Sequence, residues 1–164
     1  MRHGEAEVLE PKRDKERALS AIGITDCVNI GKYLCSKGYG PDSIICSNAR
    51  RTIESSELVS SKFENSISIS FSDSLYLSSY HDLLLEIQTV PSSVSTLLLI
   101  GHNPAIHNLV RFLLKSALAN GTNQIARNFP PGSLAILNCH VESWQDLYSD
   151  AVILDEFLIP SDLR

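Results

Sequence analysis

The sequence lacks three features that would assign it to common classes of protein. No run approaches the ~20 apolar residues that a membrane-spanning helix needs, and no apolar signal region stands at the amino terminus. The four cysteines form no Cys-x-x-Cys pair and no zinc-type spacing with the five histidines. The net charge of −5 leaves no basic excess to replace counterions on nucleic acid or an anionic membrane. We therefore expect a cytoplasmic protein with reduced cysteines, no metal, and neither nucleic acid nor membrane as a partner.

Strand and helix candidates alternate along most of the chain. With 164 residues, 43% of them hydrophobic, the chain fits one domain over residues 1–164. The pattern predicts an α/β fold, a three-layer sandwich with a mainly parallel central sheet flanked by helices. The last two strands are candidates for an antiparallel pair. The expected helices are 19–38, 48–63, 80–90 and 103–121, and the expected strands are 43–46, 66–71, 95–101, 133–141 and 151–160.

Capping signals mark the ends of two of these helices. Ser20 is a candidate N-cap and Gly38 a candidate C-terminal stop for the first helix. For the last helix, Asn103 is the expected N-cap and Pro104 the first helical residue. Two segments have no periodic pattern, and we expect loose loops at 6–16 and 120–132.

Basic side chains gather where the expected strands lead into helices. In an open α/β sheet, ligands bind beyond the carboxyl ends of the strands. Arg51 follows one strand and His102 follows another, and Arg2 and His3 occupy the same kind of junction if Met1 ends a strand. Guanidinium groups match phosphate oxygens bidentately, and a helix N-terminus adds N–H donors. This combination favours a site for a phosphoryl group.

The motifs at these junctions also resemble those of a known family. The sequences RHG at 2–4, S-x-x-x-R at 47–51 and GHNP at 101–104 resemble the histidine phosphatase, or phosphoglycerate mutase-like, superfamily. The small size, RALSAIG at 17–23, LY at 75–76 and FLIPSDL at 157–163 resemble its SixA-type phosphohistidine phosphatases. The resemblance implies a phosphoglycerate mutase-like fold. It also implies a hydrolase that works without a metal or cofactor through a phosphohistidine enzyme intermediate and acts on phosphohistidine in signal transduction.

Individual roles come from the same resemblance. It implies that His3 is the nucleophile and that Arg2 and Arg51 bind the phosphoryl oxygens. It further implies that His102 supplies positive charge and that Arg17 binds phosphate near the pocket. A histidine suits the role of nucleophile, because an imidazole with a pKa of ~6.5 is largely neutral at neutral pH and has one free nitrogen.

The sequence departs from the family pattern at the residue that serves as the general acid. Members that act on alkyl phosphates have a carboxylic acid that protonates the leaving alkoxide, and this sequence has no clear equivalent. The nearest candidates are Asp73, Glu5 and Asp14. A phosphohistidine substrate relaxes the need for an acid, because imidazole leaves more readily than an alkoxide. We therefore favour phosphohistidine on a partner protein as the substrate.

Two alternatives and one structural expectation remain. The first alternative is a small-molecule or sugar phosphomonoesterase of the same superfamily. The second is a non-catalytic phosphate- or phosphoprotein-binding module, which would hold His3 too far from Arg51 and His102 to attack. Family members carry an apolar strand before RHG where this sequence has only Met1, so we expect the first strand to be short or missing.

Overall fold

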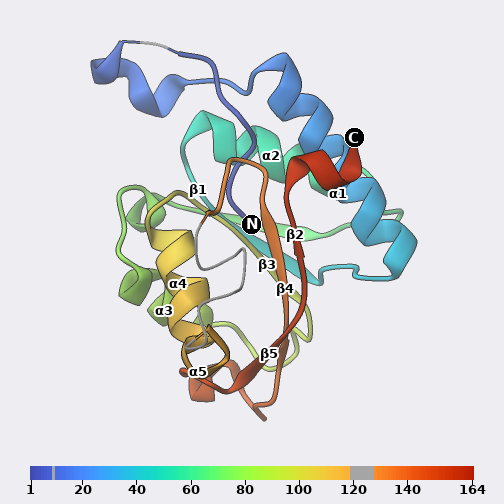
Figure 1. Cartoon of the computed structure of the whole chain (residues 1–164), viewed down its shortest axis with the longest axis vertical. Coiled ribbons are helices and arrows are strands. Elements are labelled where there is room, and N and C mark those ends of the chain that lie inside the picture. The colour runs from blue at the N-terminus through green and yellow to red at the C-terminus, as the bar shows by residue number, and fades with distance from the viewer. Residues whose placement is uncertain (9, 119–127) are drawn as a thin grey trace.

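Two sheets form the centre of the protein in the computed structural model, which describes residues 1–8, 10–118 and 128–164. Three strands make a parallel sheet in the order β2-β1-β3, and two further strands make the antiparallel pair β4-β5 (Figure 1). The strands are β1 Ser43–Ser47, β2 Ser68–Ser72, β3 Leu97–Ile100, β4 Leu134–Cys139 and β5 Val152–Leu158.

Helices lie on both sides of the parallel sheet, so the α/β sandwich expected from the sequence is confirmed (Figure 1). The α-helices are α1 Ala21–Lys37, α2 Arg50–Ser60, α3 Tyr80–Gln88, α4 Ala105–Leu113 and α5 Lys115–Leu118. The described residues also contain the short 3-10 helices η1 Pro11–Glu16, η2 Asp73–Leu75, η3 Trp144–Asp146 and η4 Pro160–Leu163.

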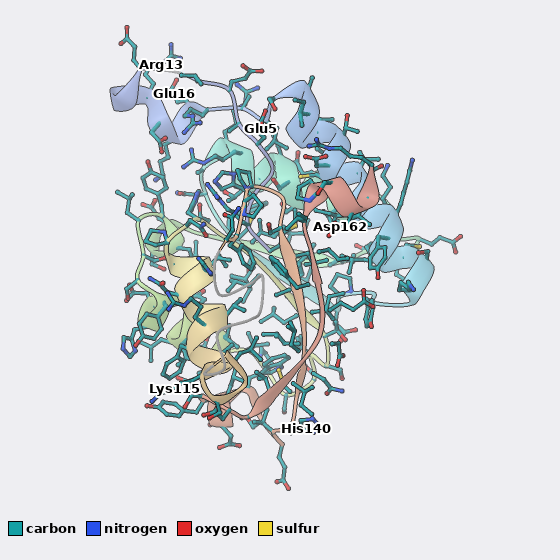
Figure 2. The ribbon with its side chains drawn as sticks, viewed as in Figure 1. Glu5, Arg13, Glu16, Lys115, His140 and Asp162 are labelled. Carbon is teal, nitrogen blue, oxygen red and sulfur yellow. The ribbon has the colours of Figure 1, made fainter. Side chains whose placement is uncertain are left out.

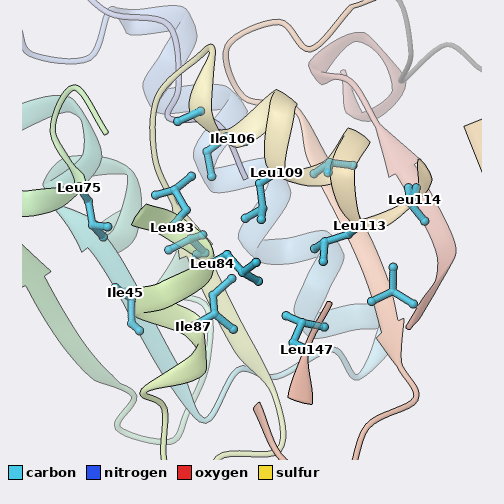
Figure 3. Packing of buried hydrophobic residues seen from close by; sticks show 14 of the residues in the cluster. Ile45, Leu75, Leu83, Leu84, Ile87, Ile106, Leu109, Leu113, Leu114 and Leu147 are labelled. Atoms are coloured by element: carbon cyan, nitrogen blue, oxygen red, sulfur yellow. The ribbon is translucent and has the colours of Figure 1, made fainter. Parts of the chain in front are cut away.

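The buried apolar residues form two clusters, one on each face of the parallel sheet. Successive side chains of a strand point to opposite faces, so Ile44 joins the cluster beneath α1 and α2, whereas Ile45 joins the cluster beneath α3 and α4. Figure 3 shows the second cluster, in which Leu83 and Ile87 of α3 lie near Leu109 of α4. Burial on both faces explains why β1 and β3 read as continuous apolar runs.

The first long helix begins and ends as the sequence predicts. The Ser20 side chain accepts a hydrogen bond from the Gly23 N–H, and Gly38 takes the left-handed conformation with a φ of 75°. Further along α1, Cys27 is buried, and all four cysteines of the chain are free thiols.

The helix predicted over 103–121 differs from the structure. Helix α4 begins at Ala105 with Pro104 as its N-cap, because the Asn103 side chain donates to the Phe129 carbonyl instead of capping the helix. The helix ends at Leu113, and a second helix, α5, starts at Lys115. Asp150 accounts for the break: its N–H bonds to the Leu113 carbonyl, and its side chain accepts from the Ser116 N–H. The predicted end at 119–121 lies outside the described residues.

The expectation of a loose loop over 6–16 is wrong in part. The charged segment contains η1, and Figure 2 shows Arg13 and Glu16 at its outer end, away from the body of the protein. The second expected loop, 120–132, falls mostly outside the described residues. Within the described ranges, no helix is long and apolar enough to cross a membrane.

The amino-terminal residues lie beside the end of β3. Arg2 makes a parallel bridge to Gly101, directly after β3, and Glu5 lies between η1 and α1 (Figure 2). Gly4 packs against α1, where a Cβ would lie 2.8 Å from the Cys27 Sγ and 2.9 Å from the Gly23 carbonyl oxygen. The absence of a side chain at Gly4 therefore lets the chain carrying His3 lie against α1.

We expect Gly23→Ala to destabilise the protein, although alanine favours helices over glycine by ~1 kcal/mol. The added Cβ would lie 2.1 Å from the Glu5 carbonyl oxygen, so α1 and the amino-terminal segment must separate. The expected loss is about 2–3 kcal/mol of unfolding free energy, measured by urea denaturation. Gly40→Ala is the control, because its Cβ would meet only Phe63, 3.7 Å away, and it should change stability by less than about 1 kcal/mol. A stabilised Gly23→Ala protein would contradict this packing.

Candidate active site

His3 is buried at the centre of the site and is held in one tautomer. Its Nδ1 lies 2.7 Å from the Gly4 carbonyl oxygen, which can only accept a hydrogen bond, so Nδ1 carries the proton. The unprotonated Nε2 accepts from the Arg51 Nε–H at 3.3 Å. The lone pair of Nε2 therefore points toward the guanidinium group.

His102 stands beside His3 and is oriented by the first strand of the sheet. The two rings have centroids 5.0 Å apart. Arg51 Nη2 donates to Nδ1 of His102 at 3.3 Å, so the other nitrogen, Nε2, carries the proton and donates to Ser47 Oγ at 2.7 Å. Thr52 supports Ser47 with a hydroxyl contact at 3.1 Å. The carboxyl ends of β1 and β3 thus fix the second imidazole.

Arg51 joins both histidines to an acidic residue. The guanidinium group is buried, and its Nη1 and Nη2 donate to the Asp14 carbonyl at 2.7 Å and the Asp14 carboxylate at 3.0 Å. Arg50, one residue earlier, instead pairs with Glu54 on the outer surface of α2. Of these two adjacent arginines, Arg51 is therefore the one that faces the histidines.

Arg2 lies close enough to both imidazoles for its charge to lower the pKa of each. Its Nη1 donates to the Phe129 carbonyl at 2.9 Å, and Asn103 Nδ2 donates to the same oxygen at 3.0 Å. The Arg2 Nε is buried and has no hydrogen-bond partner in the described structure. An unpaired buried donor is costly, so this group is available to an anion that enters the site.

Arg17 is connected to Arg51 through Asp14, which accepts hydrogen bonds from both arginines. Its described hydrogen bonds go to the carbonyls of Glu7 and Ala6 and to the Asp14 carboxylate, at 2.6, 3.4 and 3.1 Å. It therefore holds the loop that carries Asp14, and phosphate binding by Arg17 stays a prediction.

Asp14 and Tyr76 make contacts in the site that the sequence did not predict. Asp14 appeared there only as a candidate acid, yet its carboxylate accepts from Arg51, from Arg17 and from the Tyr76 hydroxyl at 2.7 Å. The Tyr76 ring lies edge-on to His102, with centroids 5.6 Å apart. The Lys15 Nζ lies over the Tyr76 ring, 5.0 Å from its centroid. The LY motif at 75–76 was the one sequence signal for Tyr76.

The surroundings hold both imidazoles in their neutral forms. Burial, followed by the charges of neighbouring groups, lowers the pKa of His3 to about 3, although the bond to Gly4 opposes this shift. Burial and the Arg51 charge lower the pKa of His102 to about 4. This shift favours the neutral form of His102 in the free protein at neutral pH, and its role as a source of positive charge toward a phosphoryl group stays a prediction. A bound phosphoryl dianion would favour its protonation.

No metal-binding cluster is present in residues 1–8, 10–118 and 128–164, where no three or more His, Cys, Asp or Glu side chains are placed to hold an ion. The positive groups around His3 are the guanidinium groups of Arg2 and Arg51. The arrangement suits an oxyanion held by N–H donors beside an unprotonated imidazole nitrogen.

The ring signals of His3 and His102 should not titrate between pH 5 and 8. Each folded-state pKa lies below the unfolded value of ~6.5, so this part of the stability is complete above pH ~6.5 and falls as the pH drops toward 4 and 3. Imidazole 15N NMR, with His3→Gln and His102→Gln for assignment, measures both. Titration of either ring near pH 6.5 would contradict this description of the site.

Comparisons with known proteins agree with this fold. No protein-family model matches the chain. An uncharacterized protein of Mycobacterium leprae is 27% identical over 148 residues, 90% of this chain and 89% of that protein. An uncharacterized protein of Mycobacterium tuberculosis is 26% identical over 165 residues, 98% of this chain and 99% of that protein.

Solved structures give a more specific likeness. A structure from Nakamurella multipartitia, which carries the name phosphohistidine phosphatase SixA, has a TM-score of 0.83 and 27% identity and covers 98% of this chain and 93% of that chain. A structure of the same name from Agrobacterium tumefaciens has a TM-score of 0.82 and 25% identity, covering 98% of this chain and 95% of that chain. The motifs at 2–4, 47–51 and 101–104 also meet at one site. The family resemblance stated from the sequence is therefore confirmed. The chain has the phosphoglycerate mutase-like fold of the histidine phosphatase superfamily and resembles its SixA-type members.

Proposed function

We propose that this protein is a phosphatase that forms a phosphohistidine intermediate on His3 and removes phosphoryl groups from phosphohistidine on a partner protein. The observation that carries the proposal is the His3 tautomer, with Nδ1–H bonded to the Gly4 carbonyl and the Nε2 lone pair beside Arg51. The name carried by the two similar solved structures supports the same activity.

The reaction would take place in two displacements at phosphorus. In the first, the His3 Nε2 lone pair forms a bond to phosphorus, and the bond between phosphorus and the substrate nitrogen breaks. The substrate leaves as neutral imidazole when its other ring nitrogen carries a proton. In the second, water attacks the phosphoryl group, the bond to Nε2 breaks, and inorganic phosphate and a proton are released. Because Nδ1 keeps its proton against Gly4, His3 also leaves as neutral imidazole.

The positive groups would stabilise charge on the transferring phosphoryl group. The transition state of phosphoryl transfer is loose, and its charge lies on the equatorial oxygens. The donors of Arg51 face His3, His102 and Asp14, and the buried Arg2 Nε lacks a partner within the described structure. An entering phosphoryl group would take over these donors, displacing the contacts between Arg51 and Asp14.

The charge states of the candidate acids support an easily displaced leaving group. Hydrogen bonds from Tyr76, Arg17 and Arg51 hold the pKa of Asp14 well below its usual range, so Asp14 is ionised at neutral pH in the free protein. Lys15 lowers the pKa of Asp73, which is exposed, and Glu5 accepts from Ser20 at the start of α1.

An alkoxide needs a proton from an acid as it leaves, whereas the imidazole of phosphohistidine, with a pKa near ~6.5, does not. This difference favours phosphohistidine over the alkyl phosphates of a phosphomonoesterase. The distances also argue against the binding-only alternative, which expected His3 far from Arg51, because the two side chains are 3.3 Å apart.

The surface beside the site suits a protein partner. Leu77 directly follows Tyr76, is 85% exposed, and has a φ of 58°, in the left-handed region that non-glycine residues seldom adopt. Leu77 therefore exposes an apolar side chain one residue along the chain from Tyr76, whose ring contacts His102. Such a side chain gains from burial against another protein surface.

Rapid quench with a labelled phosphohistidine protein tests the proposal. We expect an acid-labile, alkali-stable phosphoryl-enzyme in the wild type that disappears in His3→Ala, and faster formation from phosphohistidine than from an aryl phosphate. His81→Ala is the matched control, because the His81 ring stacks on Tyr80 away from the site, and it should form the adduct normally. Turnover without an adduct would contradict the intermediate, and neither adduct nor turnover would contradict the enzyme.

The Asp14→Asn variant distinguishes two roles for Asp14, a general acid and a residue that positions Arg51. If the ionised carboxylate only positions Arg51, the variant should change kcat on an aryl phosphate by less than about tenfold, and by the same factor for good and poor leaving groups. A general acid would give a loss of about 100-fold or more, concentrated on the poor leaving group. Steady-state kinetics with 4-nitrophenyl and phenyl phosphate distinguish these outcomes, with Asp73→Asn as the matched carboxylate control.

A further inference from the structure

The peptide unit that joins His3 to Gly4 is held at both of its ends. Its carbonyl, that of His3, accepts a hydrogen bond from the Gly132 N–H at 2.8 Å. Its N–H, that of Gly4, donates to the Ser55 Oγ of α2 at 3.1 Å, and Figure 1 shows the amino-terminal segment passing beside α2. Because a peptide unit is planar and rigid, these two bonds set its rotation about the chain. The backbone directly after the expected nucleophile is therefore fixed by α2 and by the segment before β4.

Ser55 also bonds to the backbone of the arginine that faces His3. Its hydroxyl donates to the Arg51 carbonyl at 2.6 Å, one turn earlier in α2. A hydroxyl has one proton and two lone pairs, so the same oxygen can donate to Arg51 and accept from Gly4. One oxygen thus joins the segment that carries His3 to the helix that carries Arg51. The side chains of those two residues meet at 3.3 Å, between His3 Nε2 and Arg51 Nε.

A buried thiol is the other neighbour of the Ser55 hydroxyl. Ser55 is 0% exposed, and Cys27 of α1 interacts with both this hydroxyl and the Gly4 N–H. Burial raises the pKa of Cys27 to about 11, so Cys27 is a neutral thiol at neutral pH, and its sulfur is a weak acceptor. Without the Ser55 oxygen, the Gly4 N–H would keep only this weak partner in a buried setting, where an unpaired donor is costly.

The direction of the Gly4 carbonyl decides the tautomer of His3. That carbonyl accepts from Nδ1–H at 2.7 Å, which leaves the Nε2 lone pair free. Glycine has more backbone freedom than any other residue, so its carbonyl keeps one direction only if neighbouring bonds hold it. The bond from the Gly4 N–H to Ser55 is one of these. Loss of this bond would let the carbonyl turn, and the His3 ring would then carry its proton on either nitrogen.

The next residue of α2 shows what a purely structural serine does in the same surroundings. Ser56 is also 0% exposed, its hydroxyl donates to the Ile53 carbonyl at 2.7 Å, and it interacts with a thiol, that of Cys46 in β1. The two serines therefore share burial, a bond to their own helix and a thiol neighbour. Among the described hydrogen bonds of the two hydroxyls, only those of Ser55 reach the amino-terminal segment.

We propose that Ser55 is a positioning residue for the nucleophile: its hydroxyl holds the His3–Gly4 peptide so that Nδ1 keeps its proton and Nε2 stays beside Arg51. The inference rests on the proposed function, in which His3 attacks phosphorus. Attack requires reacting atoms about 3–3.5 Å apart, and a misplacement of about 1 Å can cost ~100-fold in rate. Since Arg2 and Arg51 would bind the phosphoryl oxygens, Ser55 should influence the chemical step more than substrate binding.

The test compares Ser55→Ala with the matched control Ser56→Ala in the full chain. For Ser55→Ala we expect phosphoryl-enzyme formation from a labelled phosphohistidine protein to slow by about 10- to 100-fold, while KM changes by less than about threefold. We also expect the 15N signals of the His3 ring, assigned with His3→Gln, to change from a single Nδ1–H tautomer to a mixture of two. Ser56→Ala should keep the wild-type rate and the single tautomer, although it too loses a buried hydroxyl.

A second variant keeps the test decisive if Ser55→Ala does not fold. Ser55→Cys nearly preserves the size of the side chain but replaces a strong acceptor with a weak one, so under reducing conditions it should show the same loss of rate and the same mixture of tautomers.

A single Nδ1–H tautomer in a folded Ser55→Ala or Ser55→Cys protein would overturn the proposal, and so would equal changes in Ser55→Ala and Ser56→Ala. The tautomer is read without substrate. If the wild type forms no phosphoryl-enzyme, the proposed function fails, whereas the ring signals still decide whether Ser55 holds His3.

Discussion

The structure depends on the backbone of residues 1–3, held between the ends of two sheets. His3 N donates to Gly101 at 3.1 Å, and Arg2 N donates to Ser133 at 2.9 Å. Because Gly101 directly precedes His102, these bonds set the spacing of the two imidazoles through the backbone rather than through flexible side chains. A site built on strand ends is positioned more firmly than one built on loops alone.

Burial of the His3 and His102 imidazoles beside Arg51 has two opposite consequences. It lowers the pKa of His3 to about 3 and of His102 to about 4, which weakens the folded state in acid because unfolding lets both rings take up protons. The same burial keeps the His3 Nε2 lone pair free at neutral pH, as a nucleophile requires. Asp14 compensates for part of the charge by accepting hydrogen bonds from Arg51 and Arg17.

Sequence reasoning succeeded where the signal was local. The Ser20 cap, the Gly38 stop and the continuous apolar pattern of β3 depend on residues within a few positions of one another. It failed at Asn103, whose side chain bonds to the Phe129 carbonyl, 26 residues away, rather than to its own helix. It also gave Asp14 no structural role, since its bond to Arg51 spans 37 residues and no short motif records it.

The sequence by itself determined the fold class and the gathering of Arg2, His3, Arg51 and His102, because strand ends at one edge of a parallel sheet bring their following residues together. Only the tertiary structure decided the tautomer of His3, the neutral state of His102 and the ionised state of Asp14. These properties depend on burial and on the hydrogen-bond partners of each group. Segments distant in the chain supply both, so only the folded arrangement can specify them.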